Sequence, residues 1–317
     1  MPSMNNDYQH NKNKGYFEIA REPSSISSEV FTEKYYKTET PVIIENIGQD
    51  WPAISTWSED YIREKLAKDA KAKAASLWYW MEKGSLEEDY QTPKIIDQLL
   101  DSENVFPRNE LMRIWAHPQG NVSSWHYDAN MVNVFNVQMT GKKKWYLVSP
   151  ETPLDCYPFT SFAIMDGNDE KIFNNKNYTR VILNQGDMLY IPPLWFHKVI
   201  SLEEENLNLN WIFTKKTTDV VSTTLKRELD RYSLQSYLSN HRYQWVQKTF
   251  SNINQNIPGY LRWKWRYPEM IETPVKPRVF ALTRLTVKEI SSLAKVALHA
   301  KKIKPYIESI RSIKKLS

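Results

Sequence analysis

Two histidines and one acid, spread across a strand-rich stretch, constrain this chain more than any other feature. His126 and Asp128 stand two positions apart, and His197 follows 71 positions later, just beyond a Pro-Pro turn. Because side chains alternate between the two faces of a β-strand, His126 and Asp128 can point at the same place. Two imidazoles and one carboxylate, with three coordination positions left open, suit the non-haem Fe(II) oxygenases. The pattern therefore predicts an iron site of that kind.

The sequence around these three residues agrees with strands. The apolar stretch FNVQM follows the H-x-D pair, and after the turn TG comes the basic stretch KKKWYLV, which together predict a hairpin-like unit. The later stretch GDMLYIPPLWFHKVI predicts a turn, a strand, a Pro-Pro bend and a second strand that carries His197. An H-x-D triplet alone is weak evidence, but here the ligand chemistry and the strand pattern point to the same arrangement.

Four stretches of the chain carry a family resemblance. They are TPVIIENIGQDWPAISTWSEDYIREKL, SSWHYD, QMTGKKKWYLVSP, and GDMLYIPPLWFHKVIS followed by NLNLNWIF, and they span about residues 40–215. In amino-acid sequence and in order along the chain they resemble the JmjC or cupin-8 branch of the Fe(II) and 2-oxoglutarate dependent oxygenases. The resemblance implies a double-stranded β-helix, a jelly-roll or cupin-like core. We therefore expect a mainly β fold with α additions over residues 16–215, followed by a helical C-terminal region.

The resemblance also implies roles for particular residues. The metal ligands of the family fall on His126, Asp128 and His197. Ser123, three positions before the first histidine, matches a hydroxyl position that assists the co-substrate. Asn210, within NLNW, matches an asparagine on the last barrel strand.

A lysine is expected to hold the co-substrate. In members of the family a basic residue two places after the hairpin glycine binds the distal carboxylate of 2-oxoglutarate, and here the residue two places after Gly141 is Lys143. An ammonium group facing a carboxylate in a partly dry barrel suits this role. Lys142 and Lys144 would then point the other way. The alternative is that all three lysines form a solvated strand edge, which charge commonly protects.

The chain departs from the family pattern in one place. Gly141 lies fifteen residues after His126, whereas members of the family usually have about thirteen. Counting back from Gly141 puts Val134 where the family places an asparagine, and Asn136, which has the same strand parity, is the alternative. We expect this insertion to reshape the substrate site rather than to remove catalysis.

The resemblance implies a reaction in which 2-oxoglutarate and O2 become succinate and CO2 while an unactivated C–H bond is hydroxylated. The expected substrate is a protein or peptide side chain, with a tRNA base or a small molecule as alternatives. N-demethylation begins with the same attack on a C–H bond and stays open. A cupin that binds metal without catalysis is the rival class, and the complete triad argues against it.

The remaining segments of residues 16–215 predict further elements. We expect an entry strand and a short helix over 16–40, a buried strand at TPVIIEN, and an amphipathic helix over 58–74 with Ser58 as its N-cap. A strand follows at SLWYWMEKG, then a helix at TPKIIDQLLDSENV and a strand at LMRIWAHP, whose His117 is expected to be structural. The loop-rich insert 149–180 is a candidate lid or substrate-recognition element.

Bulk properties restrict the cellular setting. Residues 1–15 have no apolar stretch of a signal peptide and predict a disordered lead-in. A single cysteine, Cys156, excludes an internal disulfide framework and favours a reducing cytoplasm. No run of about 18 apolar residues occurs, so no membrane span is expected.

The region 216–317 differs in charge from the rest. From residue 215 onward the chain has 21 Lys and Arg against 7 Asp and Glu (21 − 7 = +14), which leaves 21 − 30 = −9 for residues 1–214. Its helical spacing predicts basic helices that pack on the acidic domain or form a homodimer with a second copy. The stretch LRWKWRYP, in which cations and aromatic residues alternate, keeps RNA and anionic lipid open as other partners.

Overall fold

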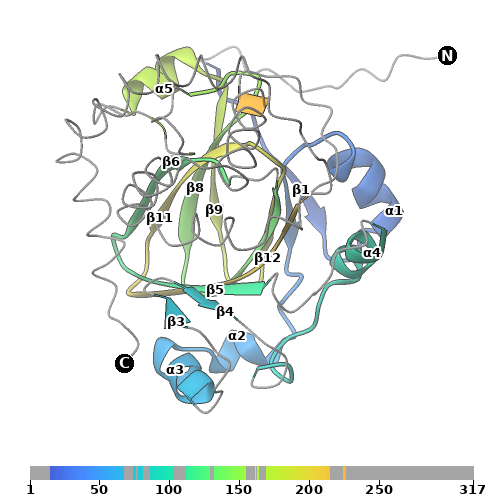
Figure 1. Ribbon diagram of the computed structural model, residues 1–317, viewed down its shortest axis with the longest axis vertical. Coiled ribbons are helices and arrows are strands. Elements are labelled where there is room, and N and C mark those ends of the chain that lie inside the picture. The colour runs from blue at the N-terminus through green and yellow to red at the C-terminus, as the bar shows by residue number, and fades with distance from the viewer. Residues whose placement is uncertain are drawn as a thin grey trace, which may run out of the picture.

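Two β-sheets stacked face to face, with helices over one of them, make up the described part of the chain (Figure 1). The computed structural model describes residues 15–67, 74–75, 78–80, 86–102, 112–128, 132–154, 161, 163, 169–214 and 224–225. The predicted lead-in and nearly all of the basic C-terminal region lie outside these residues. The elements are β1 (Ala20–Pro23), α1 (Ser28–Phe31), the π-helix η1 (Thr32–Tyr36), β2 (Val42–Glu45), α2 (Pro52–Thr56), α3 (Glu59–Ala67), β3 (Ala74–Ala75), β4 (Trp78–Trp80), α4 (Lys94–Ser102), β5 (Met112–Pro118), β6 (Val122–His126), β7 (Val132–Thr140), β8 (Lys143–Val148), α5 (Glu170–Asn175), β9 (Tyr178–Leu183), β10 (Met188–Ile191), β11 (Phe196–Ser201) and β12 (Glu205–Thr214).

The order of the strands is that of a jelly roll. The larger sheet runs β1-β2-β10-β7-β12-β5-β4-β3, and the smaller one runs β6-β11-β8-β9. Strands β7 and β8 follow each other in the chain but belong to different sheets, so the predicted hairpin-like unit is wrong. The chain turns the corner at Gly141, whose φ of 73° places it in the left-handed region. A Cβ there would lie 2.1 Å from the carbonyl oxygen of Glu205, so only glycine fits.

Strand alternation divides the side chains of the large sheet between two apolar layers. On β7, Phe135 and Val137 join the cluster that packs under helices α1 to α4. Val132 and Val134 point the other way and pack between the sheets with residues such as Trp145 of β8. The helices therefore cover the outer face of the large sheet, and the second apolar layer lies between the two sheets.

The helix predicted over 58–74 begins as expected and ends sooner. Ser58 Oγ accepts a hydrogen bond from the backbone N–H of Tyr61 at 3.1 Å, which is the expected N-cap contact. Helix α3 ends at Ala67, and Ala74 instead lies in β3, where it pairs with Tyr79. Pairing with a neighbouring strand thus overrides the high helix propensity of Ala74.

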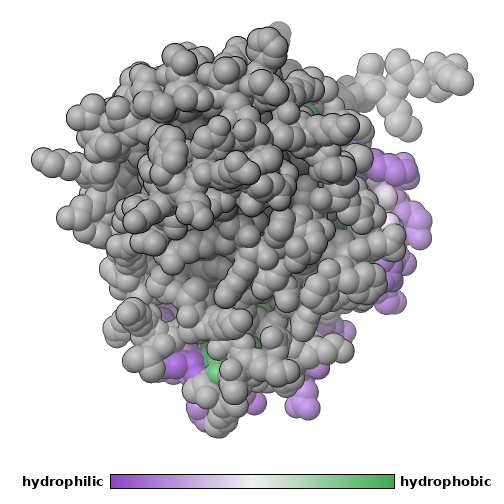
Figure 2. Space-filling view, in the orientation of Figure 1, coloured by the Kyte–Doolittle hydropathy of each residue, from purple (hydrophilic) through white to green (hydrophobic). Residues whose placement is uncertain are grey.

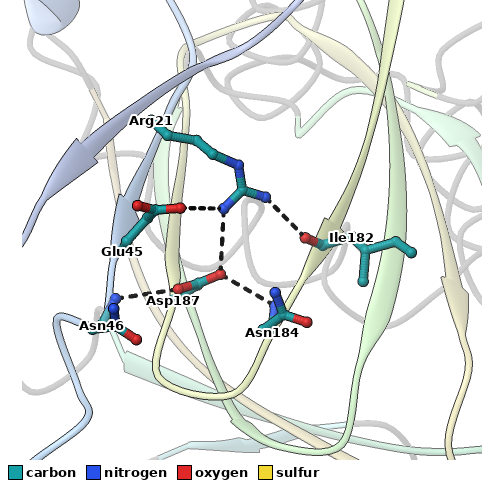
Figure 3. Close-up of polar contacts among 6 residues, drawn as sticks. All are labelled: Arg21, Glu45, Asn46, Ile182, Asn184 and Asp187. Atoms are coloured by element: carbon teal, nitrogen blue, oxygen red, sulfur yellow. Dashed lines mark hydrogen bonds and ion pairs between the residues drawn. The ribbon is translucent and has the colours of Figure 1, made fainter.

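A polar cluster ties the N-terminal strands to the β9–β10 turn (Figure 3). The Arg21 guanidinium lies 2.8 Å from a Glu45 carboxylate oxygen and 3.7 Å from Asp187 Oδ2, and it donates to the carbonyl of Ile182 at 3.3 Å. Asp187 is buried and accepts hydrogen bonds from the backbone N–H groups of Asn46 and Asn184 at 3.2 and 3.3 Å. The cluster fixes the start of β10, the strand that leads through the Pro-Pro bend to His197.

The outer surface is mainly polar where it is described. Figure 2 shows hydrophilic residues over the α1 side of the molecule. Among the residues whose burial is described, Val30 and Ile182 are the exposed large hydrophobic side chains. In the same part of the chain, no helix has both the length and the apolar character needed to cross a membrane.

Candidate metal centre

Three side chains from two neighbouring strands and the loop after β6 converge between the sheets. His126 on β6 is registered with His197 on β11, and their ring centroids lie 4.3 Å apart. Asp128 Oδ2 lies 3.6 Å from His197 Nε2, and one ligand atom from each of the three residues falls within 4.8 Å of the other two. Neighbouring ligands around a metal with bonds of ~2.1 Å are ~3 Å apart, so a small closure would complete the site.

The two imidazoles are held in matching orientations. His126 Nδ1 lies 2.6 Å from the carbonyl oxygen of Ser124, and His197 Nδ1 lies 3.1 Å from that of Trp195. Only a protonated Nδ1 can donate to these carbonyls, so the lone pair of each ring is on Nε2, the atom left for a metal. Both histidines are buried. The strand backbone therefore presets the tautomer and the direction of both rings.

A β-bulge lets a second residue of β6 face the interior. The register between β6 and β11 shifts between His197 and Val199, so Ser123 pairs with Val199 even though it lies three positions before His126. Val199 packs in the apolar cluster between the sheets, and residues paired across strands share a face. The side chain of Ser123 therefore lies on the same face as His126, which simple alternation would not have given.

Lys143 is almost fully buried, with 2% of its surface exposed, whereas the Lys142 side chain is 52% exposed. The solvated strand edge is therefore wrong for Lys143. Its Nζ lies 2.9 Å from Nδ1 of His117, its hydrogen-bond partner within the described residues. Burial lowers the pKa of Lys143 to about 7. Burial and the neighbouring lysine charge also lower the pKa of His117 well below its usual range, so the neutral imidazole accepts from the ammonium.

Buried amides line the large sheet beside this pair. Asn136 on β7 is registered with Asn210 on β12 and donates to its Oδ1 at 2.6 Å. Asn208 Nδ2 lies 2.7 Å from both Asn136 Oδ1 and Gln138 Oε1. Val134 packs instead in the apolar cluster between the sheets. Of the two candidates for the family's asparagine position, Asn136 therefore lies beside Asn210, and Val134 does not.

These residues fit an acidic, oxygen-rich ligand. Among the described residues no acid is paired with the buried Lys143, although an ammonium removed from water needs a counter-charge. Asn208 Oδ1 and Trp145 Nε1 are also buried and lack hydrogen-bond partners in that part of the chain. An ionised keto acid supplies the negative charge that Lys143 lacks and oxygens that can accept from Trp145 Nε1, and the His-Asp-His set fits Fe(II).

His117 is the main residue of this environment that the sequence prediction missed. It was expected to be structural, and its ring contacts the buried Lys143 and stacks near that of Trp115, with centroids 5.9 Å apart. On strand β5, Met112, Ile114 and Ala116 pack under the helices. The residues between and after them, which include His117, point to the other face of the sheet. That alternation was the available signal, because it puts His117 on the face that looks toward the other sheet.

A jelly roll with two histidines and an aspartate converging between its sheets defines a class, the cupin-fold proteins with a facial-triad metal site. Residues 68–219 match the family described as a cupin-like domain. Residues 68–219 of this chain are thus similar to cupin-like domains, and the His-Asp-His site suits Fe(II).

Three curated relatives to which the chain is similar carry names of different activities. The chain is 29% identical to arginine-specific demethylase JMJ22 of Arabidopsis thaliana, over 56% of this chain and 43% of that protein. It is 27% identical to the 2-oxoglutarate and iron-dependent oxygenase JMJD4 of Mus musculus, over 50% and 40% respectively. It is 30% identical to tRNA wybutosine-synthesizing protein 5 of Danio rerio, over 46% and 43%. The chain spans about half or less of the length of these relatives.

Proposed function

We propose that this protein is an Fe(II) and 2-oxoglutarate dependent oxygenase that hydroxylates an unactivated C–H bond, with a protein or peptide side chain as the preferred substrate. The observation that carries the proposal is the meeting of His126, Asp128 and His197 within 4.8 Å, together with a buried lysine that lacks an acidic partner in the described chain. The triad suits the metal, and Lys143 suits the co-substrate.

In this proposal each residue contributes binding or orientation. His126 and His197 would hold the iron through Nε2 and Asp128 through a carboxylate oxygen, and the Nδ1 contacts to backbone carbonyls keep the two rings aimed inward. Lys143 binds the distal carboxylate of 2-oxoglutarate through a charge-assisted hydrogen bond. Asn136, Asn210 and Ser123 supply amide and hydroxyl groups to the same molecule.

Bound Fe(II) supplies the redox chemistry, in which O2 gives one oxygen to succinate as 2-oxoglutarate loses CO2 and the other to the substrate as a hydroxyl. The chain has no need of an acid or base of its own for this reaction. Its task is to hold the reactants in register and to keep water away, which the burial of both histidines and of Lys143 supports.

A screen for substrate-stimulated succinate tests the proposal. Peptides, RNA and metabolite pools would be supplied with Fe(II), 2-oxoglutarate and ascorbate, and products would be analysed for a mass gain of one oxygen. Substrate-dependent succinate that is lost in His126→Ala supports the assignment. Metal binding without any succinate, with or without substrate, would favour a non-catalytic cupin.

Two specific observations favour alternative outcomes of the same chemistry. The similarity to a tRNA wybutosine-synthesizing protein favours a tRNA base as substrate, and the similarity to an arginine-specific demethylase favours N-demethylation. RNA in the succinate screen separates the first from a peptide substrate. Formaldehyde release, which accompanies loss of a methyl group and not stable hydroxylation, separates the second.

We also propose that the domain of residues 16–215 works in a reducing cytoplasm and that the basic region 216–317 either packs on it or forms a homodimer. The charges of the two parts, −9 for residues 1–214 and +14 beyond, favour such docking. Light scattering of the full chain measures the dimer. Salt-dependent binding of tRNA would instead favour an RNA-binding role for this region.

A further inference from the structure

Strand β6, which carries His126, is weakly supported within its own sheet. Among the described strands it is an edge strand that pairs with β11 alone, and that pairing is interrupted by the bulge next to His197. By comparison, β11 pairs with β8 along six consecutive residues without interruption. The residue that is expected to bind iron therefore lies on the least continuous pairing in the small sheet.

The insert between β8 and β9 supplies the missing support. The backbone N–H of Tyr127 donates to the carbonyl of Ser161 at 3.0 Å, and that of Ala163 donates to the carbonyl of Trp125 at 2.8 Å. These two hydrogen bonds join the insert to the residues immediately before and after His126. The free edge of β6 is thus covered where the first histidine lies.

One carboxylate of the insert then links both histidine strands. Asp169, the N-cap residue of α5, accepts from Trp125 Nε1 at 3.0 Å through one oxygen and pairs with Lys198 Nζ through the other. Trp125 directly precedes His126, and Lys198 directly follows His197. Asp169 therefore bridges the two strands at the positions next to the two histidines.

The bridge lies behind the site, on the face of the small sheet that looks away from the other sheet. Lys198 is registered with Tyr146, whose ring lies 6.2 Å from that of Trp125 and 5.3 Å from that of Phe173 in α5. Trp125 is 1% exposed. In Figure 1, α5 lies close to the end of the small sheet where β6 is labelled. Helix α5 is thus packed against the reverse side of the strands that hold the histidines.

We propose that Asp169 is a positioning residue that sets the separation of His126 and His197, and that Ser161, Ala163 and α5 act as a brace for the metal centre. This inference rests on the proposed function, because it assumes that the two histidines bind the metal. Freed from Asp169, Trp125 and Lys198 can separate, and the bulged β6–β11 pairing then lets the two imidazoles drift from the spacing that a metal needs.

Co(II) titration of the full chain, followed by its visible absorption, tests the brace without relying on turnover. Asp169→Asn keeps an acceptor for Trp125 but removes the charge that pairs with Lys198, and Lys198→Met removes the other partner. Both should weaken Co(II) binding about tenfold, the effect expected when the support of a ligand is lost. Trp125→Phe changes no charge but removes the hydrogen bond to Asp169, so it should also weaken Co(II) binding.

Asp169→Asn and Lys198→Met change the charge in opposite directions, so the pair distinguishes a positioning role of Asp169 from a purely electrostatic one. Asp169→Asn removes a negative charge near the metal, whereas Lys198→Met removes a positive one, so an electrostatic effect would weaken binding in the first and tighten it in the second. Tighter Co(II) binding in Lys198→Met overturns the proposal. Lys34→Met, which breaks the exposed ion pair with Glu22, is the matched control and should bind Co(II) like the unaltered protein.

Two further outcomes keep the brace and the proposed function apart. If His126→Ala retains full Co(II) affinity, the metal centre itself is wrong. If His126→Ala loses Co(II) while Asp169→Asn, Lys198→Met and Trp125→Phe all bind it like the unaltered protein, only the brace is wrong. A fall in the melting temperature of these three variants with unchanged Co(II) affinity would likewise make Asp169 purely structural.

Discussion

Replacing Lys143 with methionine should stabilise the protein while weakening its binding of 2-oxoglutarate. Burial lowers the pKa of this lysine from 10.5 to about 7, a difference of about 3.5. At about 1.4 kcal/mol for each pKa unit, keeping the ammonium buried costs the folded state about 4 to 5 kcal/mol near neutral pH. Methionine keeps the apolar stem of the side chain and removes that cost.

The gain is reduced by what the substitution leaves behind. His117 Nδ1 loses its donor, and an unsatisfied buried acceptor costs about 1–3 kcal/mol. The net stabilisation of the ligand-free protein should be about 1–4 kcal/mol, or several degrees in melting temperature for a domain of this size. Loss of a hydrogen bond to a charged group, worth about 1.5–3 kcal/mol, should weaken 2-oxoglutarate binding roughly 10- to 150-fold.

Differential scanning calorimetry of the ligand-free protein at pH 7 and titration calorimetry with 2-oxoglutarate measure the two effects. Lys142→Met is the matched control, because the Lys142 side chain is half exposed and its loss should change the free energy of unfolding by about 0.5 kcal/mol or less. The reasoning is refuted if Lys143→Met melts at or below the temperature of the Lys142→Met protein and still binds 2-oxoglutarate normally.

Three other predictions follow from the described residues. The ligand-free protein should gain stability as pH rises from about 7 toward 10, because in that window the unfolded chain still holds the Lys143 proton that the folded chain has released. Urea unfolding across this range measures the free energy of unfolding against pH, and the slope of that plot should flatten in Lys143→Met. Turnover of 2-oxoglutarate should be abolished in His126→Ala and in Asp128→Ala, and full succinate production by either variant would refute the ligand assignment. Gly141→Ala should cost well over 1 kcal/mol of unfolding free energy in urea, since its Cβ would lie 2.1 Å from a carbonyl of β12; Gly120→Ala, with a similar φ of 75° but nothing within 4 Å, should cost distinctly less, and equal losses would mean that the close contact is unimportant.

The sequence was most informative where one strand alone determines the geometry. The family resemblance predicted a jelly roll with Lys143 inside it, and alternation along the strand then put Lys142 on the other side. The spacing of residues along a single strand fixes the face on which each of these two lysines lies. The structure accordingly brings together side chains that are 71 positions apart in the chain.

Prediction failed where pairing between strands, and not the local sequence pattern, decides the structure. The turn at Gly141 suggested a hairpin, but β7 pairs with β10 and β12, whose partnership cannot be read from local sequence. Ala74 was expected in a helix and instead pairs with Tyr79. Ser123 reaches the inner face only through a bulge. The contacts of Asp169 with Trp125 and Lys198 join segments far apart in the chain, and no local sequence pattern predicts them.

The position of β12 in the large sheet has a consequence for how the protein is made. This strand, the last of the described strands in chain order, lies in the sheet interior between β5 and β7, where it bonds to both. During synthesis the large sheet stays open until residue 214 has left the ribosome, so assembly must wait for long-range pairing, which is slow. The gap between β5 and β7 is then expected to close only late in synthesis.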